Sequence, residues 1–166
     1  MNLEIVLTPV QLEAANSLMA RLAVSPVAVL RGVTGVGKTA ILKAVQAMRG
    51  GVFLGAQQFM DERLAQEPAA IEEAFFRMME DAIESHDLVL VDGLSLVTNA
   101  ARGGGHGRVH LLDAALTAIL AEARVLGGKL VFAVEEDIPW PIRRRAQIVQ
   151  VGDVGQTLPS VNAAAG

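Results

Sequence analysis

The feature that most constrains this chain is the segment GVTGVGKT, residues 32–39, which matches the pattern G-x-x-x-x-G-K-[ST]. It follows an apolar run, VAVLR, and continues into KTAILKAVQAM, in which apolar residues recur at helical spacing. A strand, a glycine-rich turn and a helix in that order are the context in which this pattern binds phosphate. We therefore expect an α/β fold built around a phosphate-binding loop.

The chemistry of phosphate binding explains the spacing of this loop. Glycines at 32, 35 and 37 let successive backbone N–H groups turn inward around phosphate oxygens. The helix N-terminus adds positive potential, Lys38 reaches the β- and γ-phosphates of a nucleotide, and Thr39 offers its hydroxyl to Mg²⁺. The predicted nucleotide-binding residues are Gly32, Val33, Thr34, Gly35, Val36, Gly37, Lys38, Thr39 and Ala40.

The rest of the chain alternates short strand-like runs with helical ones, which indicates a parallel sheet covered by helices. The first helix is expected to begin near residue 9, with Thr8 and Gln11 forming a capping box. A glycine-rich loop is expected at 101–108. The expected strands are 27–31, 51–56, 87–92, 129–134 and 147–151, and the other expected helices are 38–48, 68–86 and one through 112–123.

Composition bounds the class of protein. The 166 residues suffice for one domain, expected at 1–154, with 155–166 as a tail or linker. Although 52% of residues are hydrophobic, no apolar run reaches the ~18 residues that a spanning helix needs, so no membrane association is expected. The absence of cysteine favours a cytoplasmic protein, and a net charge of −4 does not indicate nucleic-acid binding.

The second candidate site residue is Asp92, which ends the apolar run LVLVD. A phosphate loop needs a carboxylate at the end of a neighbouring strand to hold the metal ion, and Asp92 is the natural candidate. An aspartate that caps a turn before Gly93 is the alternative interpretation. Thr39 and Asp92 are thus the expected Mg²⁺-binding residues.

With these motifs, the order of elements resembles the AAA+ ATPases across roughly residues 8 to 151. The resemblance rests on the phosphate loop, LVLVDGLSLV, LVFAVEED and PIRRRAQIVQV. It implies a P-loop NTPase fold, a three-layer α/β/α sandwich whose five-stranded parallel sheet has the order 5-1-4-3-2. It also implies ATP or ADP with Mg²⁺ as ligands, and a homo-oligomeric ring or filament, or a larger AAA+ assembly, in which neighbours share active sites.

Three departures from the AAA+ pattern bear on catalysis. The family usually places a glutamate after the metal-binding acid, where this chain has Gly93, and a polar sensor after the fourth strand, where it reads EED. It usually also continues into a helical lid, whereas this chain ends soon after the fifth strand. In the implied strand order, Glu135 and Glu136 lie beside the γ-phosphate, so one of them is a candidate for a relocated catalytic base. The alternative is that both are exposed loop charges and hydrolysis is very slow.

The resemblance also singles out Arg143, Arg144 and Arg145, just before the fifth strand, as candidates to reach a neighbour's γ-phosphate. A rigid cation there neutralises charge that grows in the transition state. A solvated basic turn is the alternative.

Three functions remain open from the sequence. The first is a weak or slow ATPase in an oligomeric remodelling or motor assembly, with Lys38, Asp92 and the acids and arginines above as its catalytic residues. The second is a nucleotide-gated scaffold that does not hydrolyse ATP, which Gly93 favours. The third is a small-molecule P-loop kinase, for which RRR lies too late in the chain and is too compact to serve as a lid.

Overall fold

A computed structural model describes residues 4–65 and 71–152. Their centre is one sheet of five parallel strands in the order β2-β3-β4-β1-β5. Read from the other edge, this is the predicted order 5-1-4-3-2. The strands are β1 (Val27–Arg31), β2 (Val52–Leu54), β3 (Leu88–Asp92), β4 (Lys129–Val134) and β5 (Gln147–Gln150).

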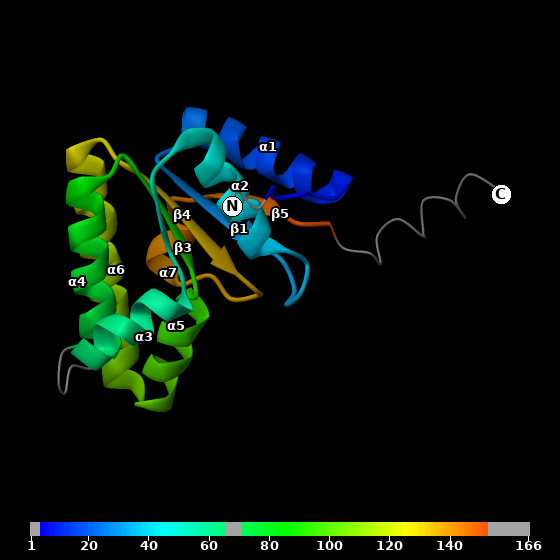
Figure 1. Ribbon diagram of the computed structural model, residues 1–166. Coiled ribbons are helices and arrows are strands. Elements are labelled where there is room, and N and C mark those ends of the chain that lie inside the picture. The colour runs from blue at the N-terminus through cyan, green and yellow to red at the C-terminus, as the bar shows by residue number, and fades with distance from the viewer. Residues whose placement is uncertain (1–3, 66–70, 153–166) are drawn as a thin grey trace.

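Helices cover both faces of the sheet and complete the expected three layers (Figure 1). Two helices, α1 (Pro9–Val24) and α2 (Lys38–Arg49), pack on one face. The other face carries α3 (Ala56–Ala65), α4 (Ile71–Ser85), α5 (Leu94–Gly103), α6 (His106–Leu126) and the single turn α7 (Trp140–Arg143). The capping box predicted for Thr8 and Gln11 is present at the start of α1.

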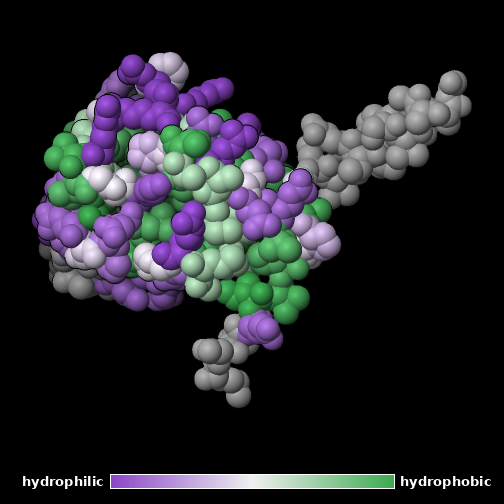
Figure 2. Space-filling view, turned by 90° about the horizontal axis from the view of Figure 1, so that it is seen from above, coloured by the Kyte–Doolittle hydropathy of each residue, from purple (hydrophilic) through white to green (hydrophobic). Residues whose placement is uncertain are grey.

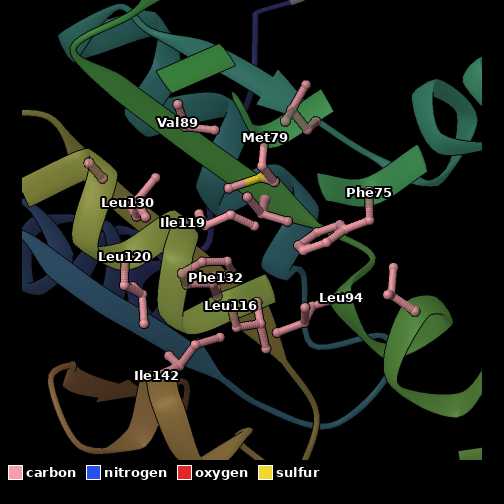
Figure 3. Packing of buried hydrophobic residues seen from close by; sticks show 14 of the residues in the cluster. Phe75, Met79, Val89, Leu94, Leu116, Ile119, Leu120, Leu130, Phe132 and Ile142 are labelled. Atoms are coloured by element: carbon pink, nitrogen blue, oxygen red, sulfur yellow. The ribbon is translucent and has the colours of Figure 1, made fainter. Parts of the chain in front are cut away.

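Alternation along the strands divides the core into two clusters. On β4, Leu130, Phe132 and Val134 face the layer that contains α4 and α6, and Val131 and Ala133 face α1 and α2. Figure 3 shows the larger cluster, in which side chains from helices and strands interdigitate around Phe132. Because β1, β3 and β4 are buried on both faces, they read as continuous apolar runs, which is why the sequence reveals them.

Two helices were not expected from the sequence. The segment after β2 forms α3, and the segment after Gly93 forms α5, so the apolar LSLV is helical. The predicted loop at 101–108 is wrong, because α5 extends to Gly103 and α6 begins at His106. The predicted start of a helix at residue 68 and the predicted tail at 155–166 lie outside the described residues.

A charged pair between buried Glu72 and partly exposed Arg108 joins α4 to α6. The Glu72 side chain is only 10% exposed, and its Oε2 accepts a hydrogen bond from Arg108 Nη2 at 2.8 Å. Burial disfavours the ionised carboxylate, but the hydrogen bond and charge of Arg108, with a backbone hydrogen bond, outweigh burial and lower the pKa of Glu72. This pair therefore holds the starts of two helices together as ions.

The high hydrophobic content serves the core and also reaches the surface. Figure 2 shows one face, on which hydrophilic residues are interrupted by several patches of hydrophobic ones. Among the exposed apolar side chains are Val6 and Val125, each 85% exposed, and Val24 at 80%. Within 4–65 and 71–152, no helix combines the length and apolar character needed to cross a membrane.

Candidate nucleotide-binding site

The phosphate loop lies where the sequence predicts it, between the end of β1 and the start of α2. Gly35 and Gly37 have φ of +84° and +98°, values that side-chain-bearing residues rarely adopt. A Cβ added at Gly35 would meet nothing within 4 Å, so there the backbone conformation, rather than crowding, requires glycine. The loop then leads directly into α2, whose first residue is Lys38. These features form the concave backbone and helix terminus that suit an anion.

Lys38 turns back over this loop. Its Nζ donates hydrogen bonds to the carbonyl oxygens of Gly32 at 2.5 Å and Val33 at 3.0 Å. The ammonium group therefore lies within the curve of the loop, where a nucleotide's phosphates are expected. This position supports its assignment as a phosphate-binding residue.

Thr39 and Asp92 come together from α2 and the end of β3. The Thr39 hydroxyl donates to Asp92 Oδ2 at 2.5 Å, although 53 residues separate them in the sequence. A hydroxyl and a carboxylate oxygen are hard ligands that suit Mg²⁺, which takes few protein ligands and completes its shell with phosphate and water. Among the described residues, no cluster of three or more His, Cys, Asp or Glu could hold a metal ion without a nucleotide. The pair therefore fits a nucleotide-associated Mg²⁺ better than a metal held by protein ligands alone.

Gln11 is a site residue that the sequence revealed only as a helix cap. Its Oε1 accepts from the Thr8 backbone N–H at 3.0 Å, and its Nε2 donates to the Val36 carbonyl at 3.1 Å. A Cβ on Gly37 would lie 2.2 Å from Gln11 Nε2. One side chain thus ties the start of α1 to the phosphate loop. No local pattern marks this role, because the contact joins residues 25 positions apart.

Gly93 occupies the position where the AAA+ pattern has glutamate, and its backbone explains the difference. It caps α5 with φ +113° and ψ 14°, in the left-handed region. A Cβ there would make only ordinary contacts, the nearest being 3.4 Å from the Ala56 backbone nitrogen, so the backbone angle and not crowding disfavours a side chain. A glutamate at position 93 would be strained in this backbone. The missing carboxylate is therefore linked to a local conformation that requires glycine.

The acids after β4 lie at the carboxyl end of the strands, on the same side of the sheet as the loop. Because β4 lies between β1 and β3, Glu135 comes next to the loop, and its Oε1 accepts from the Thr34 hydroxyl at 2.7 Å. Glu136 is exposed and lines two hollows with Glu135, one of about 270 Å³ beside Val33 and one of about 160 Å³ against α5. Glu135 therefore contacts the phosphate loop directly, whereas Glu136 borders the solvent-filled space around it.

The three arginines lie away from this end of the strands. Arg143 ends α7, and Arg144 and Arg145 follow it just before β5. Strand β5 runs parallel to β1 and pairs Gln147 with Ala28 near the start of β1. Arg143, Arg144 and Arg145 therefore lie where the strands begin, at the end of the sheet opposite the phosphate loop, and all are exposed. A chain with this geometry does not bring them to its own loop.

Comparison with known proteins identifies the fold. No protein-family model matches the sequence, and no curated protein gives a significant match. Among solved structures, replication initiator DnaA bound to AMPPCP and single-stranded DNA aligns with 98% of this chain at TM-score 0.57 and 15% identity. AMPPCP-bound DnaA from Aquifex aeolicus aligns with 96% at 0.56 and 17%. A DNA replication initiation factor aligns with 93% at 0.52 and 18%.

The chain has the fold of a P-loop NTPase. The sheet order, the loop between β1 and α2, and these alignments agree on this, and they confirm the fold that the AAA+ resemblance implies. The P-loop chain covers 52%, 52% and 48% of the three matched structures, so it spans about half their length. Identities of 15–18% extend the likeness to the fold and no further.

Proposed function

We propose that this P-loop chain is an AAA+-like domain that binds ATP with Mg²⁺. The observation that carries the proposal is the pairing of Thr39 with Asp92 at 2.5 Å beside a loop whose glycines have positive φ. A solvated glycine-rich turn would have no reason to bring a hydroxyl and a carboxylate together from two elements. Both DnaA structures that align with this chain contain AMPPCP, which supports a nucleotide as the ligand.

Each residue has a distinct task in this proposal. The backbone N–H groups of residues 32–40 and the start of α2 hold the phosphate oxygens. Lys38 exchanges its carbonyl partners for phosphate oxygens, which hold the ammonium more strongly because they are charged. Thr39 and Asp92 hold Mg²⁺, which when bound neutralises phosphate charge. Gln11 keeps the loop in position through the Val36 carbonyl.

For the reaction, we propose slow hydrolysis with Glu135 or Glu136 orienting the water. The contact between Glu135 and Thr34 places one carboxylate beside the loop, and Glu136 follows it in the chain. A carboxylate at this place takes the proton of the attacking water, the role that residue 93 does not fill. The exposed arginines would act on a neighbour's nucleotide in an oligomer, because they lie at the other end of their own sheet.

A second candidate function is a nucleotide-gated scaffold without turnover. Gly93 favours it, because glycine supplies no carboxylate after Asp92 and its φ of +113° disfavours a glutamate there. The two functions share nucleotide binding and differ only in whether Glu135 or Glu136 replaces the missing base.

Calorimetric titration with ATP, with Mg²⁺ and then with EDTA, tests the proposal. We expect binding with Mg²⁺, and weaker binding with EDTA or in Asp92→Asn. Asp113→Asn on α6 is the matched control, because Asp113 lines a separate hollow beside Trp140 and should leave binding unchanged. Absence of ATP binding by the folded wild-type protein at millimolar nucleotide would overturn the proposal. A phosphate-release assay on the same samples then separates the slow ATPase from the scaffold.

A further inference from the structure

The segment EEDIPWPIRRR, residues 135–145, has a mirrored sequence that the nucleotide site does not explain. Outward from Trp140, proline matches proline, isoleucine matches isoleucine, and three acids then match three arginines at equal distances. We call this the mirrored segment. Its two ends carry opposite charge, so a second copy running in the opposite direction would bring the acids of one copy to the arginines of the other.

The fold uses only the inner part of the mirrored segment. Pro141 and Ile142 are buried, and Ile142 joins the larger core cluster. Trp140, in contrast, is 65% exposed, and the three acids and the three arginines are all exposed as well. A large exposed aromatic side chain between two charged groups is typical of a protein interface, where Trp and Arg are enriched.

The topology places the two charged groups on opposite sides of Trp140. The segment leaves the carboxyl end of β4, where the phosphate loop lies, and returns to the amino end of β5. These ends lie on opposite sides of the sheet because the two strands run in the same direction. A strand of six residues, such as β4, is about 20 Å long at ~3.3 Å per residue. The acids and arginines are therefore separated by roughly the length of a strand, and α7 bridges them. In Figure 1, α7 lies on the α6 side of the sheet, between those ends.

The charges of the mirrored segment are not paired with each other in the chain. Asp137 bonds Arg102 of α5 at 3.1 Å, an exposed pair, and the Arg144 guanidinium lies 5.8 Å from the centre of the Trp140 ring. No ion pair among residues 4–65 and 71–152 joins the acids 135–137 to the arginines 143–145. Glu135 accepts a hydrogen bond from the Thr34 hydroxyl, and the acids and the arginines are all exposed to charges outside the chain.

We propose that two copies of this chain associate through the mirrored segment around a two-fold axis at Trp140. In such a contact, residue i of one copy meets residue j of the other and the reverse also holds. The acids 135–137 of each copy then face the arginines 143–145 of its partner, and the two Trp140 side chains meet at the axis. Only opposite charges and apolar groups are brought together. This inference does not depend on nucleotide binding.

The contact is expected to be weak and sensitive to salt. Eleven residues per copy are fewer than the ~20–30 per side of a standard interface. Exposed ion pairs are screened when the ionic strength rises. Arginines engaged with the partner's acids are not available to a neighbour's nucleotide at the same time. The two-fold dimer and the trans-acting assembly proposed above therefore exclude each other within one pair of subunits.

Disulfide cross-linking tests the position of the axis, and the chain offers a clean background because it has no cysteine. Only a residue on a two-fold axis meets its own copy closely enough for a disulfide, which needs Cα atoms within about 7 Å. Trp140→Cys should form covalent dimers in mild oxidant, whereas Val125→Cys, at the exposed end of α6, should remain mostly monomeric. Equal cross-linking of the two variants would overturn the proposal.

A mixed pair keeps Trp140 in place, in case its loss weakens the contact. Asp137→Cys and Arg143→Cys face each other across the proposed axis, so their mixture should cross-link mainly as the mixed dimer. Each variant alone should cross-link much less. Preferential self-cross-linking of either variant would contradict the two-fold arrangement.

Charge reversal tests the complementarity without nucleotide. We expect the wild-type protein to reach the mass of two chains at high concentration and low salt in sedimentation experiments. Changing residues 135–137 to Arg, or 143–145 to Glu, should give monomers with unchanged circular dichroism. An equimolar mixture of these two variants should recover the two-chain mass, because both contacts are again complementary. Monomers in every sample, or assemblies larger than two, would overturn the proposal.

Discussion

The phosphate-binding part of the site and the hydrolytic part lie at the same end of one sheet, yet they differ in how closely they follow the AAA+ pattern. The binding part has the full loop, with Lys38 folded back onto the loop carbonyls and Thr39 bonded to Asp92. The hydrolytic part has Gly93 after β3 and consecutive glutamates after β4. In the proposed function, binding and turnover depend on separate residues, and the first set follows the AAA+ pattern more completely than the second.

The difference shows that the binding part can be complete while the hydrolytic part varies. Phosphate binding relies on backbone N–H groups in a fixed turn, so it tolerates few sequences. A catalytic carboxylate needs only to reach the attacking water, and more than one strand end meets that requirement. Glu135 follows the neighbouring strand β4 and contacts the loop through Thr34, so the end of β4 is one place from which a carboxylate could reach the water.

The largest expected effect concerns the arginines, which would complete the hydrolytic part from another subunit. Lys38→Ala subunits, which retain the arginines, should restore turnover when mixed with subunits in which Arg143, Arg144 and Arg145 are all Ala. An arginine acting in trans contributes ~10³-fold or more in rate, so partial recovery is measurable by phosphate release. Neither variant alone should turn over. Equal specific activity of wild type and the triple Ala variant at all concentrations would assign the arginines no role in hydrolysis.

The next effect tests the relocated base. If turnover is present, Glu135→Gln or Glu136→Gln should slow it by about 100-fold or more, the usual contribution of a general base. ATP affinity should stay equal or rise slightly, because one negative charge near the phosphates is removed. Asp137→Asn is the matched control, since its carboxylate bonds Arg102 instead of the loop. Substantial wild-type turnover that neither Gln variant slows would rule out both glutamates.

Lys38→Ala should weaken ATP binding directly, and turnover should be lost with it. Loss of charged hydrogen bonds worth about 1.5–3 kcal/mol predicts a roughly 10- to 150-fold fall in ATP affinity, with the fold retained. Calorimetry and circular dichroism measure the two quantities. Lys43→Ala is the control, because Lys43 is five residues further along and lies over the Phe53 ring, 5.4 Å from its centre. Unchanged ATP affinity in Lys38→Ala would show that the loop is not the binding site.

The smallest effect concerns Gly93. From the AAA+ pattern alone, Gly93→Glu is expected to supply the missing carboxylate and raise hydrolysis, but its φ of +113° argues against that. We expect Gly93→Glu and Gly93→Ala to be destabilised alike, by about 1–2 kcal/mol, without a gain in turnover. That corresponds to a fall in Tm of roughly 2–8 °C. A clear rise in turnover in Gly93→Glu but not Gly93→Ala would show that the backbone adjusts and that the comparison between the two parts is incorrect.

Several elements were predictable because their causes are local. The loop needs glycines at set positions, and β1, β3 and β4 are apolar runs because both faces are buried. The helix start at Thr8 follows from a capping box, which two residues three positions apart determine. The order of the strands came from the resemblance to a family, since periodicity does not contain it.

The helices α3 and α5 were not predicted from the sequence. The segment LSLV continues an apolar strand in the sequence, whereas in the fold it is helical and packs with α5 against α6, α4 and β4. The glycines at 103–105 suggested a long loop, although α5 includes Gly103 and only Gly104 and Gly105 lie between the helices. Local propensity is a weak guide when tertiary contacts decide the conformation.

The sequence by itself determined the glycine-rich loop with its flanking strand and helix, and it made Asp92 the candidate metal-binding acid, which stays a prediction. Each rests on residue types that short-range backbone geometry and ligand chemistry require. Only the tertiary structure decided that Gln11 supports the loop, that Glu135 contacts Thr34, and that Gly93 adopts a conformation closed to glutamate. These depend on contacts between segments far apart in the chain, whose distances and backbone angles arise only when the sheet and its two helical layers pack together.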